Sequence, residues 1–258
     1  MGEVESGRGP HRCQDLAMVI PEIREWSIDA RNHPDHARNP IHTDVGAQAA
    51  GFPRALVAGV TTYAYLTHPV VVAWGETWLR SGGGEVRFRR PVFDKDTLRC
   101  CPVVSESGIS IHALTDEPDQ PRATFSLLRD AGSAPAMRAG TQLVTHHVSL
   151  VGNLADQYGI NVGDSLPLYT ENGWVHPAVW TALANDVVHT QIARGSWVHT
   201  RSIIRHHDIG HVGSVAEVRA TVAKTFESHG ERAVLDIHIL IDQKIVASLE
   251  HEAIIALP

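Results

Sequence analysis

Two stretches of this chain are apolar almost without interruption over the length of a helix. Residues 55–79 (ALVAGVTTYAYLTHPVVVAWGETWL) offer few polar side chains on any face, which predicts a helix that is buried on most sides. Pro69 lies within it, so we expect the helix to be distorted there or to end its first part. Residues 176–192 (HPAVWTALANDVVHTQI) repeat the pattern and place Pro177 near the first turn, where proline is tolerated.

Runs of β-forming residues follow each of these stretches. They mix alternating apolar and polar positions with turn residues at their ends, which is typical of strands. Before the first helix, residues 18–32 are expected to start the fold as an extended segment. The predicted strands cover residues 85–93, 97–106, 108–116 and 123–130 in the first half, and 199–213, 215–228, 232–242 and 244–255 in the second. The pattern therefore predicts an α+β fold.

Both halves follow the same order, a helix first and antiparallel strands afterwards. A shift of 117 residues aligns Gly59 with His176 and Tyr63 with Trp180, which indicates an internal duplication. The alternative is two unrelated α+β modules with chance similarity. If the duplication holds, the two sheets are expected to pair edge to edge, because this removes two exposed edges.

A small, polar segment that contains Pro and Gly separates the two halves and is typical of a linker. The predicted organisation is a flexible tail over residues 1–12, an N-terminal module over 13–131, a linker over 132–142 and a C-terminal module over 143–258.

Composition and charge exclude several classes of function. The chain has 258 residues, of which 43% are hydrophobic, and a net charge of -7 without a Lys/Arg-rich run. A nucleic-acid partner is therefore disfavoured. No apolar window is long enough for a membrane-spanning helix, and the acidic first residues lack the apolar core of a signal peptide. The three cysteines are too few for a disulfide framework, which favours a reducing, cytoplasmic location.

One loop carries candidate chemistry. Residues 39–60 (NPIHTDVGAQAAGFPRALVAGV) hold a single histidine, His42, behind an Asn-Pro pair and ahead of the first predicted helix. This stretch resembles the hydratase motif of the MaoC-like dehydratases, also called (R)-specific enoyl-CoA hydratases. The positions that match in order are Asn39, Pro40, His42, Asp44, Gly51, Phe52 and Gly59.

The resemblance covers most of residues 22–100, because residues 86–98 (VRFRRPVFDKDTL) also look like the strand pair of that family. It implies a double hotdog, in which each of two copies wraps a curved antiparallel sheet around one long helix. Only the first half carries the motif, so the resemblance implies one active pocket per chain, between the two halves.

One position departs from the family pattern, since the catalytic aspartate falls on Ala37 here. In the parent chemistry, Asp and His position the water that adds to, or leaves from, an α,β-unsaturated acyl thioester. We therefore expect His42 to act as the base and Asp35 to stand in for the missing acid, with Asn39 and Asp44 as further catalytic candidates. A structural interpretation stays open, because a loop histidine often only forms hydrogen bonds and Asp44 could cap a helix.

Substrate binding is expected at the start of the first helix, where the family uses backbone N–H groups to polarise the thioester carbonyl. An arginine in the loop could bind an anionic substrate, and the start of the second helix could line the pocket or serve only as a helix start. The candidate substrate-binding residues are Arg38, Ala58, Gly59, Thr61, His176 and Asn185.

The resemblance implies a hydratase or dehydratase, hence a lyase, that acts without a cofactor on an acyl group carried by coenzyme A or a carrier protein. Two alternatives stay open. The scaffold could perform another acid–base reaction, such as elimination, cyclisation or thioester hydrolysis, or it could be a non-catalytic acyl-binding or heterodimer helper subunit.

No metal site is expected, because the adjacent histidines at 146–147 and 206–207 would face opposite sides of a strand. A homodimer is expected, since two chains can pair along a sheet edge.

Overall fold

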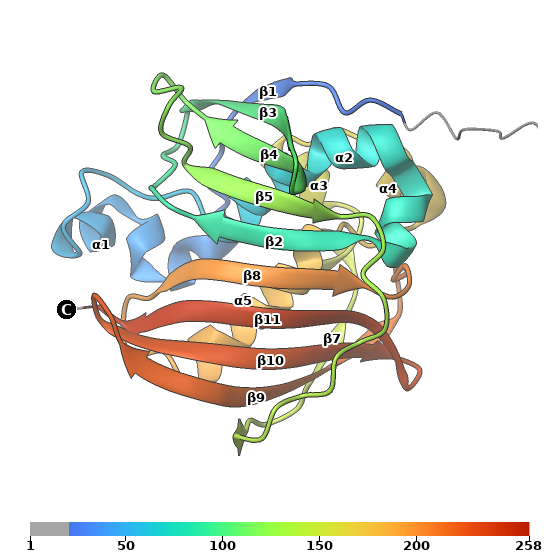
Figure 1. Cartoon of the computed structure of the whole chain (residues 1–258). Coiled ribbons are helices and arrows are strands. Elements are labelled where there is room, and N and C mark those ends of the chain that lie inside the picture. Colours follow the sequence, from blue (N-terminus) through green and yellow to red (C-terminus); the bar gives the residue numbers. More distant parts are fainter. Residues whose placement is uncertain (1–20, 258) are drawn as a thin grey trace, which may run out of the picture.

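An eleven-stranded sheet, antiparallel at every pairing, runs through residues 21–257, the part of the chain that this computed structural model describes (Figure 1). The predicted tail, residues 1–12, lies outside the described residues. The N-terminal strands are β1 (Trp26–Asp29), β2 (Gly83–Phe88), β3 (Thr97–Ser105), β4 (Gly108–Leu114) and β5 (Ala123–Leu128). The C-terminal strands are β6 (Thr141–Gln142), β7 (His146–Ser149), β8 (Val198–His206), β9 (Val215–Glu227), β10 (Glu231–Ile241) and β11 (Lys244–Ala256).

The order of the strands confirms the duplication. The first half runs β3-β4-β5-β2 and the second half β9-β10-β11-β8, so each half has the same internal order. Strands β2 and β8 pair antiparallel, with Gly84 opposite Ile204, and join the two halves into one sheet. The expected edge-to-edge pairing is therefore confirmed, and it covers the edge that each half would otherwise expose.

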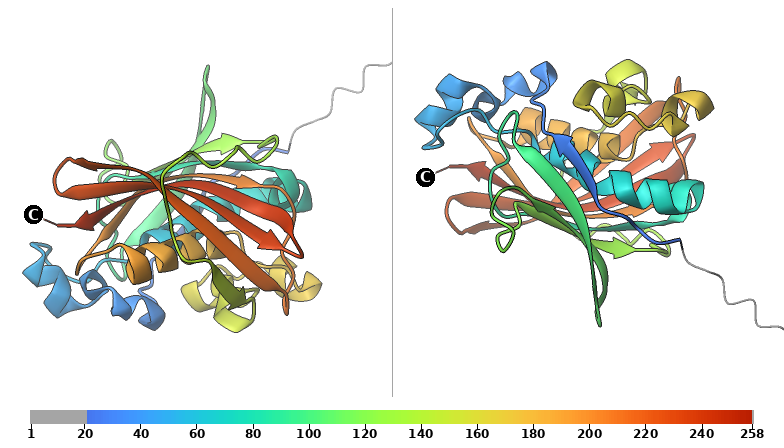
Figure 2. Two further views of the ribbon diagram at one scale, coloured as in Figure 1. Left: turned by 90° about the horizontal axis from the view of Figure 1, so that it is seen from below. Right: turned by 90° about the horizontal axis from the view of Figure 1, so that it is seen from above.

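Two long helices, α2 (Gly59–Ser81) and α5 (Ala178–Gln191), run side by side against one face of this sheet (Figure 2). Helix α2 is buried at nearly every position from Val60 to Val71, as its apolar sequence predicts. Of the two outcomes expected at Pro69, distortion or an end of the first part, the end is wrong, because the helix continues through Pro69. The irregularity lies at Gly75 instead, whose φ of 49° is available to glycine without strain.

The remaining helices are short and lie on the side of α2 and α5 that faces away from the sheet (Figure 2). They are the 3₁₀ turns η1 (Pro34–Arg38), η2 (Pro40–His42) and η3 (Gly152–Leu154), and the α-helices α1 (Asp44–Ala49), α3 (Tyr158–Val162) and α4 (Leu168–Asn172). The segment expected to be a linker, residues 132–142, contains β6, which pairs with β9. Among the described residues, no helix has the length and apolarity needed to cross a bilayer.

Candidate active site

The motif loop is held in shape by local features of its sequence. Pro40 starts η2, and the Thr43 side chain caps α1 by accepting a hydrogen bond from the Gly46 N–H at 3.2 Å. A Cβ at Gly46 would lie 2.1 Å from the Pro40 carbonyl oxygen, so only glycine permits this close approach of the two backbones. These residues fix the position of His42 at the end of η2.

The His42 ring is oriented by a single hydrogen bond to the backbone. Its Nδ1 lies 2.8 Å from the Leu56 carbonyl oxygen. A carbonyl oxygen only accepts, so Nδ1 carries the proton and Nε2 keeps a free lone pair. Burial lowers the pKa of His42 below its usual value, and the hydrogen bond to Leu56 partly opposes this shift. His42 is therefore a neutral imidazole at neutral pH, with Nε2 able to accept a proton.

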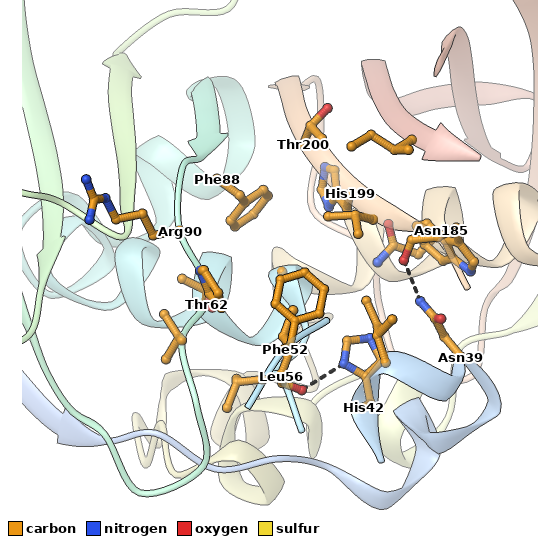
Figure 3. A pocket seen from close by; sticks show the side chains of 18 of the residues that line it. Asn39, His42, Phe52, Leu56, Thr62, Phe88, Arg90, Asn185, His199 and Thr200 are labelled. Carbon is orange, nitrogen blue, oxygen red and sulfur yellow. Dashed lines mark hydrogen bonds between the residues drawn. The ribbon is translucent and has the colours of Figure 1, made fainter. Parts of the chain in front are cut away.

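His42 lines a cavity of about 270 Å³ between the two halves of the chain. Figure 3 shows Asn39 and His42 on the motif loop, with Asn185 of α5 and His199 of β8 facing them from the C-terminal half. Gly59, the first residue of α2, also lines the cavity. The structure thus brings together four residues that the motif and the helix pattern predicted: Asn39, His42, Gly59 and Asn185.

Three buried polar atoms on this cavity have no hydrogen-bond partner within residues 21–257: Asn39 Oδ1, Asn185 Oδ1 and His199 Nδ1. Asn39 is otherwise well held, since its Nδ2 donates to the Trp197 carbonyl oxygen at 2.9 Å. Unpaired buried polar groups are uncommon in folded proteins and costly when isolated. Their convergence on one cavity indicates a site shaped for a polar ligand.

The start of α2 supplies backbone donors to the same place. The first helical hydrogen bond of α2 joins the Thr62 N–H to the Ala58 carbonyl oxygen. The N–H groups of Gly59, Val60 and Thr61 have no acceptor in the described part of the chain, and no side chain caps this helix. A helix start with free N–H groups favours a negatively charged or polarised oxygen.

The lining of this cavity contains histidine, asparagine and arginine but, among residues 21–257, no aspartate or glutamate. Arg89 and Arg90 are exposed at the cavity. Arg232 also lines it and pairs with Glu252 at 2.7 Å. Arg90 pairs with Glu117 at 3.6 Å, so of these three arginines only Arg89 has no ion pair among the described residues. No described carboxylate lines the cavity beside His42.

Both expected carboxylates lie elsewhere. Asp35 is exposed and accepts a hydrogen bond from Asn153 at 2.6 Å. It lines a second cavity of about 390 Å³ together with Arg38, whose guanidinium pairs with Asp186 at 2.5 Å. Asp44 is exposed at the first residue of α1 and accepts a hydrogen bond from the Ala55 N–H at 2.8 Å.

Three other candidates, Thr61, Ala58 and His176, are buried, and none of them lines the cavity. The Thr61 hydroxyl faces the Tyr158 hydroxyl at 3.1 Å, whereas its neighbour Thr62 lines the cavity. Ala58 precedes the first residue of α2 and offers no side-chain cap.

His176 belongs to a buried hydrogen-bonded network in the core. Its Nε2 lies 3.2 Å from Asp164, which also binds the Nδ1 of His68 at 2.7 Å. Asp164 is fully buried, and its hydrogen bonds to the two histidines hold the pKa of its carboxyl below the usual value, against the opposing effect of burial. Because His68 lies on α2 and His176 lies two residues before the start of α5, the network links the two halves.

Sequence reasoning missed two histidines: His199, which lines the same cavity as His42, and His36, which lines the second cavity with Asp35. His36 lies 5.8 Å from His42 between ring centroids, and its Nε2 lies 3.3 Å from the Thr61 hydroxyl. Burial and the neighbouring His42 lower the pKa of His36 to about 3. Ala37, at the position of the family's aspartate, is exposed. His199 lies in the C-terminal half, where no motif marks it, so only the fold brings it to His42.

The described residues contain no group of three or more His, Cys, Asp or Glu side chains arranged to hold a metal ion. The groups that line the His42 cavity include imidazoles, amides, guanidinium groups and the start of α2 at Gly59.

Comparison with known proteins gives one family match and several similar folds. Residues 35–113, which include the motif loop and α2, match the family model of the MaoC like domain. No curated protein sequence matches the chain.

Among solved structures, a candidate MaoC domain protein dehydratase from Chloroflexus aurantiacus J-10-fl is 11% identical, with 91% of this chain and 96% of that chain covered and a TM-score of 0.59. A conserved hypothetical protein from Mycobacterium tuberculosis, described as having a double hotdog fold, is 12% identical, with 90% and 96% covered and a TM-score of 0.62. A candidate oleoyl thioesterase from Lactobacillus plantarum is 8% identical, with 93% and 98% covered and a TM-score of 0.52. The predicted α+β double hotdog is confirmed.

Proposed function

Starting from the MaoC-like domain over residues 35–113, we propose that this protein is a hydratase or dehydratase of acyl thioesters that uses His42 for proton transfer. The observation that carries the proposal is the pairing of His42 Nδ1 with the Leu56 carbonyl oxygen, which leaves Nε2 free at a cavity that also contains the start of α2 at Gly59. A base and an oxyanion site in one cavity are what chemistry at the carbon next to a thioester requires.

In the dehydration direction, Nε2 of His42 takes the proton from the α-carbon of a 3-hydroxyacyl thioester. The electrons of that C–H bond form an enolate, whose oxygen is held by the N–H groups at the start of α2. The His42 imidazolium then gives the same proton to the 3-hydroxyl group, the C–O bond breaks, the double bond forms and water leaves. Hydration is the reverse sequence. One histidine performs both transfers, which suits a cavity that no described carboxylate lines.

The carrier of the acyl group is proposed from charge. Arg89 and Arg90 are exposed at the cavity, and arginine binds phosphate through paired hydrogen bonds. Coenzyme A and the prosthetic arm of a carrier protein both carry phosphate at the end of the pantetheine chain opposite to the thioester, so the arginines would bind the far end of that arm. The homodimer and the cytoplasmic location expected from the sequence stay predictions, and sedimentation of the full chain would test the dimer.

Thioester hydrolysis is the second candidate. One base is enough to activate a water molecule for attack on a carbonyl, and the cavity offers one base without a carboxylate partner. The similar fold of a protein described as a candidate oleoyl thioesterase supports this second candidate.

The experiment is to offer the protein crotonyl-coenzyme A, 3-hydroxybutyryl-coenzyme A and longer acyl homologues. Ultraviolet absorbance of the conjugated thioester follows hydration and dehydration, and a thiol reagent follows hydrolysis. His42→Ala should abolish the activity, while His147→Ala, a matched change at an exposed histidine of β7, should leave it unchanged. Thiol release without loss of the double bond would favour the hydrolase. Binding of acyl-coenzyme A with no turnover in either assay would favour a non-catalytic acyl-binding subunit.

A further inference from the structure

His199 has a polar ring atom that the fold itself leaves unpaired. It is 6% exposed, its Nδ1 has no hydrogen-bond partner among residues 21–257, and it lines the cavity that contains His42. A Cβ built on Gly59 would lie 3.4 Å from this Nδ1. The unpaired nitrogen therefore faces the space beside the first residue of α2, where a thioester oxygen would meet the free N–H groups.

The other nitrogen of His199 belongs to a buried chain of three side chains. His199 Nε2 lies 2.8 Å from the Ser202 hydroxyl, which lies 2.8 Å from His251 Nδ1. Ser202 and His251 are opposite each other on β8 and β11, so the sheet register fixes this contact. Both are fully buried, and the Nε2 of His251 has no partner within the described chain.

The single hydroxyl proton of Ser202 couples the two rings. In the first arrangement, Ser202 donates to His199 Nε2 and accepts from His251 Nδ1, which places the remaining His199 proton on Nδ1. In the second arrangement, His199 donates to Ser202, Ser202 donates to His251, and the His251 proton lies on Nε2. Each arrangement leaves one N–H group without an acceptor among the described residues: that of His199 Nδ1 in the first and that of His251 Nε2 in the second. His199 lines the cavity, where a ligand oxygen can accept its hydrogen bond, whereas His251 does not line it and its unpaired N–H group would be costly. The first arrangement is therefore favoured, and it turns an N–H group toward the cavity.

We propose that His199 is an oxyanion-binding residue contributed by the C-terminal half: its neutral Nδ1–H, fixed by Ser202 and His251, hydrogen-bonds the thioester carbonyl beside Gly59. This inference rests on the proposed function, because it assigns the carbonyl of that substrate to His199 and to the start of α2.

The surroundings of the ring keep it neutral. Burial and the neighbouring His251 lower the pKa of His199 well below its usual value, while the backbone of Arg201 opposes the shift. Burial also lowers the pKa of His251, to about 3. A neutral imidazole is a suitable donor here, because it stabilises the enolate oxygen through a hydrogen bond without giving up its proton.

Two substitutions of similar size separate this role from a purely structural one. The amide nitrogen of His199→Asn can occupy the position of Nδ1, so it keeps the donor toward the cavity. That of His199→Gln reaches the position of Nε2, so it keeps the contact with Ser202 and loses the donor. We expect the glutamine variant to lower kcat/KM by about 10²- to 10³-fold and the asparagine variant to retain most of the activity. The thermal stabilities of both variants and the wild type are measured alongside, so that a loss of folding is recognised. Equal activity of the glutamine variant and the wild type would overturn the proposal.

A spectroscopic readout tests the same donor without turnover. In ¹⁵N-histidine-labelled protein, ring nitrogens with and without a proton have distinct chemical shifts, and comparison with His199→Gln assigns the signals. We expect Nδ1 of His199 to carry the proton, and the carbonyl stretch of bound ¹³C-labelled butyryl-coenzyme A, which has no double bond to hydrate, to rise in His199→Gln.

An Nδ1 without a proton would contradict the inference, whatever the activity. If the wild type turns over no acyl thioester, the proposed function fails, and the protonation state of Nδ1 alone decides whether His199 is a donor. If the wild type is active and Nδ1 is bare, the inference fails and the proposed function stands.

Discussion

The ring of His42 and the backbone of Leu56 hold each other in place. His42 Nδ1 donates to the Leu56 carbonyl oxygen at 2.8 Å, and the Leu56 N–H donates to the Ile41 carbonyl oxygen at 3.0 Å. The residue that orients the imidazole is thus itself tied to the residue before the imidazole. Leu56 and Ile41 are buried together in a small cluster with Ala47, so the tautomer of His42 is set by packed backbone rather than by a carboxylate.

The pH dependence of activity follows from this environment. His42 acts as a base only when neutral, and burial lowers its pKa below 6.5. We expect kcat/KM to stay constant from about pH 8 down to about pH 6.5 and to fall only below that range. His42→Asn can still donate to Leu56 but offers no base, so it should be about 10²- to 10⁴-fold slower and show no such limb. An acid limb centred above pH 6.5 in the wild type would contradict the assignment.

The space beside Gly59 is predicted to be reserved for substrate. A Cβ there would lie 3.3 Å from the Phe88 ring and 3.4 Å from His199 Nδ1, which is tight but not forbidden. Gly59→Ala should leave the thermal stability unchanged or slightly raised, because alanine favours a helix and costs less conformational entropy than glycine. It should lower kcat/KM, and Gly59→Val should lower it further. Full activity in the valine variant would show that the substrate does not occupy this space.

The arginines at the cavity are predicted to act on the carrier and not on the acyl group. Arg89→Glu combined with Arg90→Glu should raise KM for acyl-coenzyme A by about fivefold or more, as expected for exposed charges worth about 1 kcal/mol, and added salt should reduce the difference. N-acetylcysteamine carrying the same acyl group has no phosphate and is the matched substrate. Its KM should be the same for the double variant and the wild type. Arg24→Glu, an exposed charge reversal outside the cavity, is the matched variant.

Stability is predicted to fall as the pH drops below 6.5. Burial lowers the pKa of His36 and His251 to about 3 and of His206 to about 4. Between these values and 6.5, the unfolded chain binds protons that the folded chain does not, so the free energy of unfolding decreases with falling pH. Each such histidine lowers the free energy of unfolding by up to about 1.4 kcal/mol per pH unit in this range.

Urea unfolding between pH 7.5 and 5 measures this slope. His206 lies outside the cavity lining, and its Nδ1 contacts the Trp78 carbonyl oxygen. His206→Asn should lower the number of protons that the chain takes up on unfolding by about one, and the slope decreases accordingly. His147→Asn, at an exposed position, should leave it unchanged. A stability that is flat across this range would mean that the buried histidines are protonated in the folded protein.

The sequence predicted the fold better than the site. The two apolar helices and all eight strands after them are present, because a continuous or alternating pattern of burial is written in consecutive residues. Helix α2 did not break at Pro69, since tertiary packing on all sides outweighs the local preference of proline. Within the site, Asn39, His42 and Gly59 were predicted because they share one loop and the helix that follows it.

The partners of His42 could not be predicted in the same way. Asp35 is near in sequence, yet η1 directs it to the second cavity and to Asn153. His199 lies 157 residues from His42 along the chain, and only the pairing of β2 with β8 brings it to the start of α2. By itself, the sequence determined the duplicated helix-and-sheet units and the imidazole of the motif loop, since these depend on local pattern and spacing. The tertiary structure decided which polar groups face that imidazole, because residues from the two halves meet only when β2 pairs with β8.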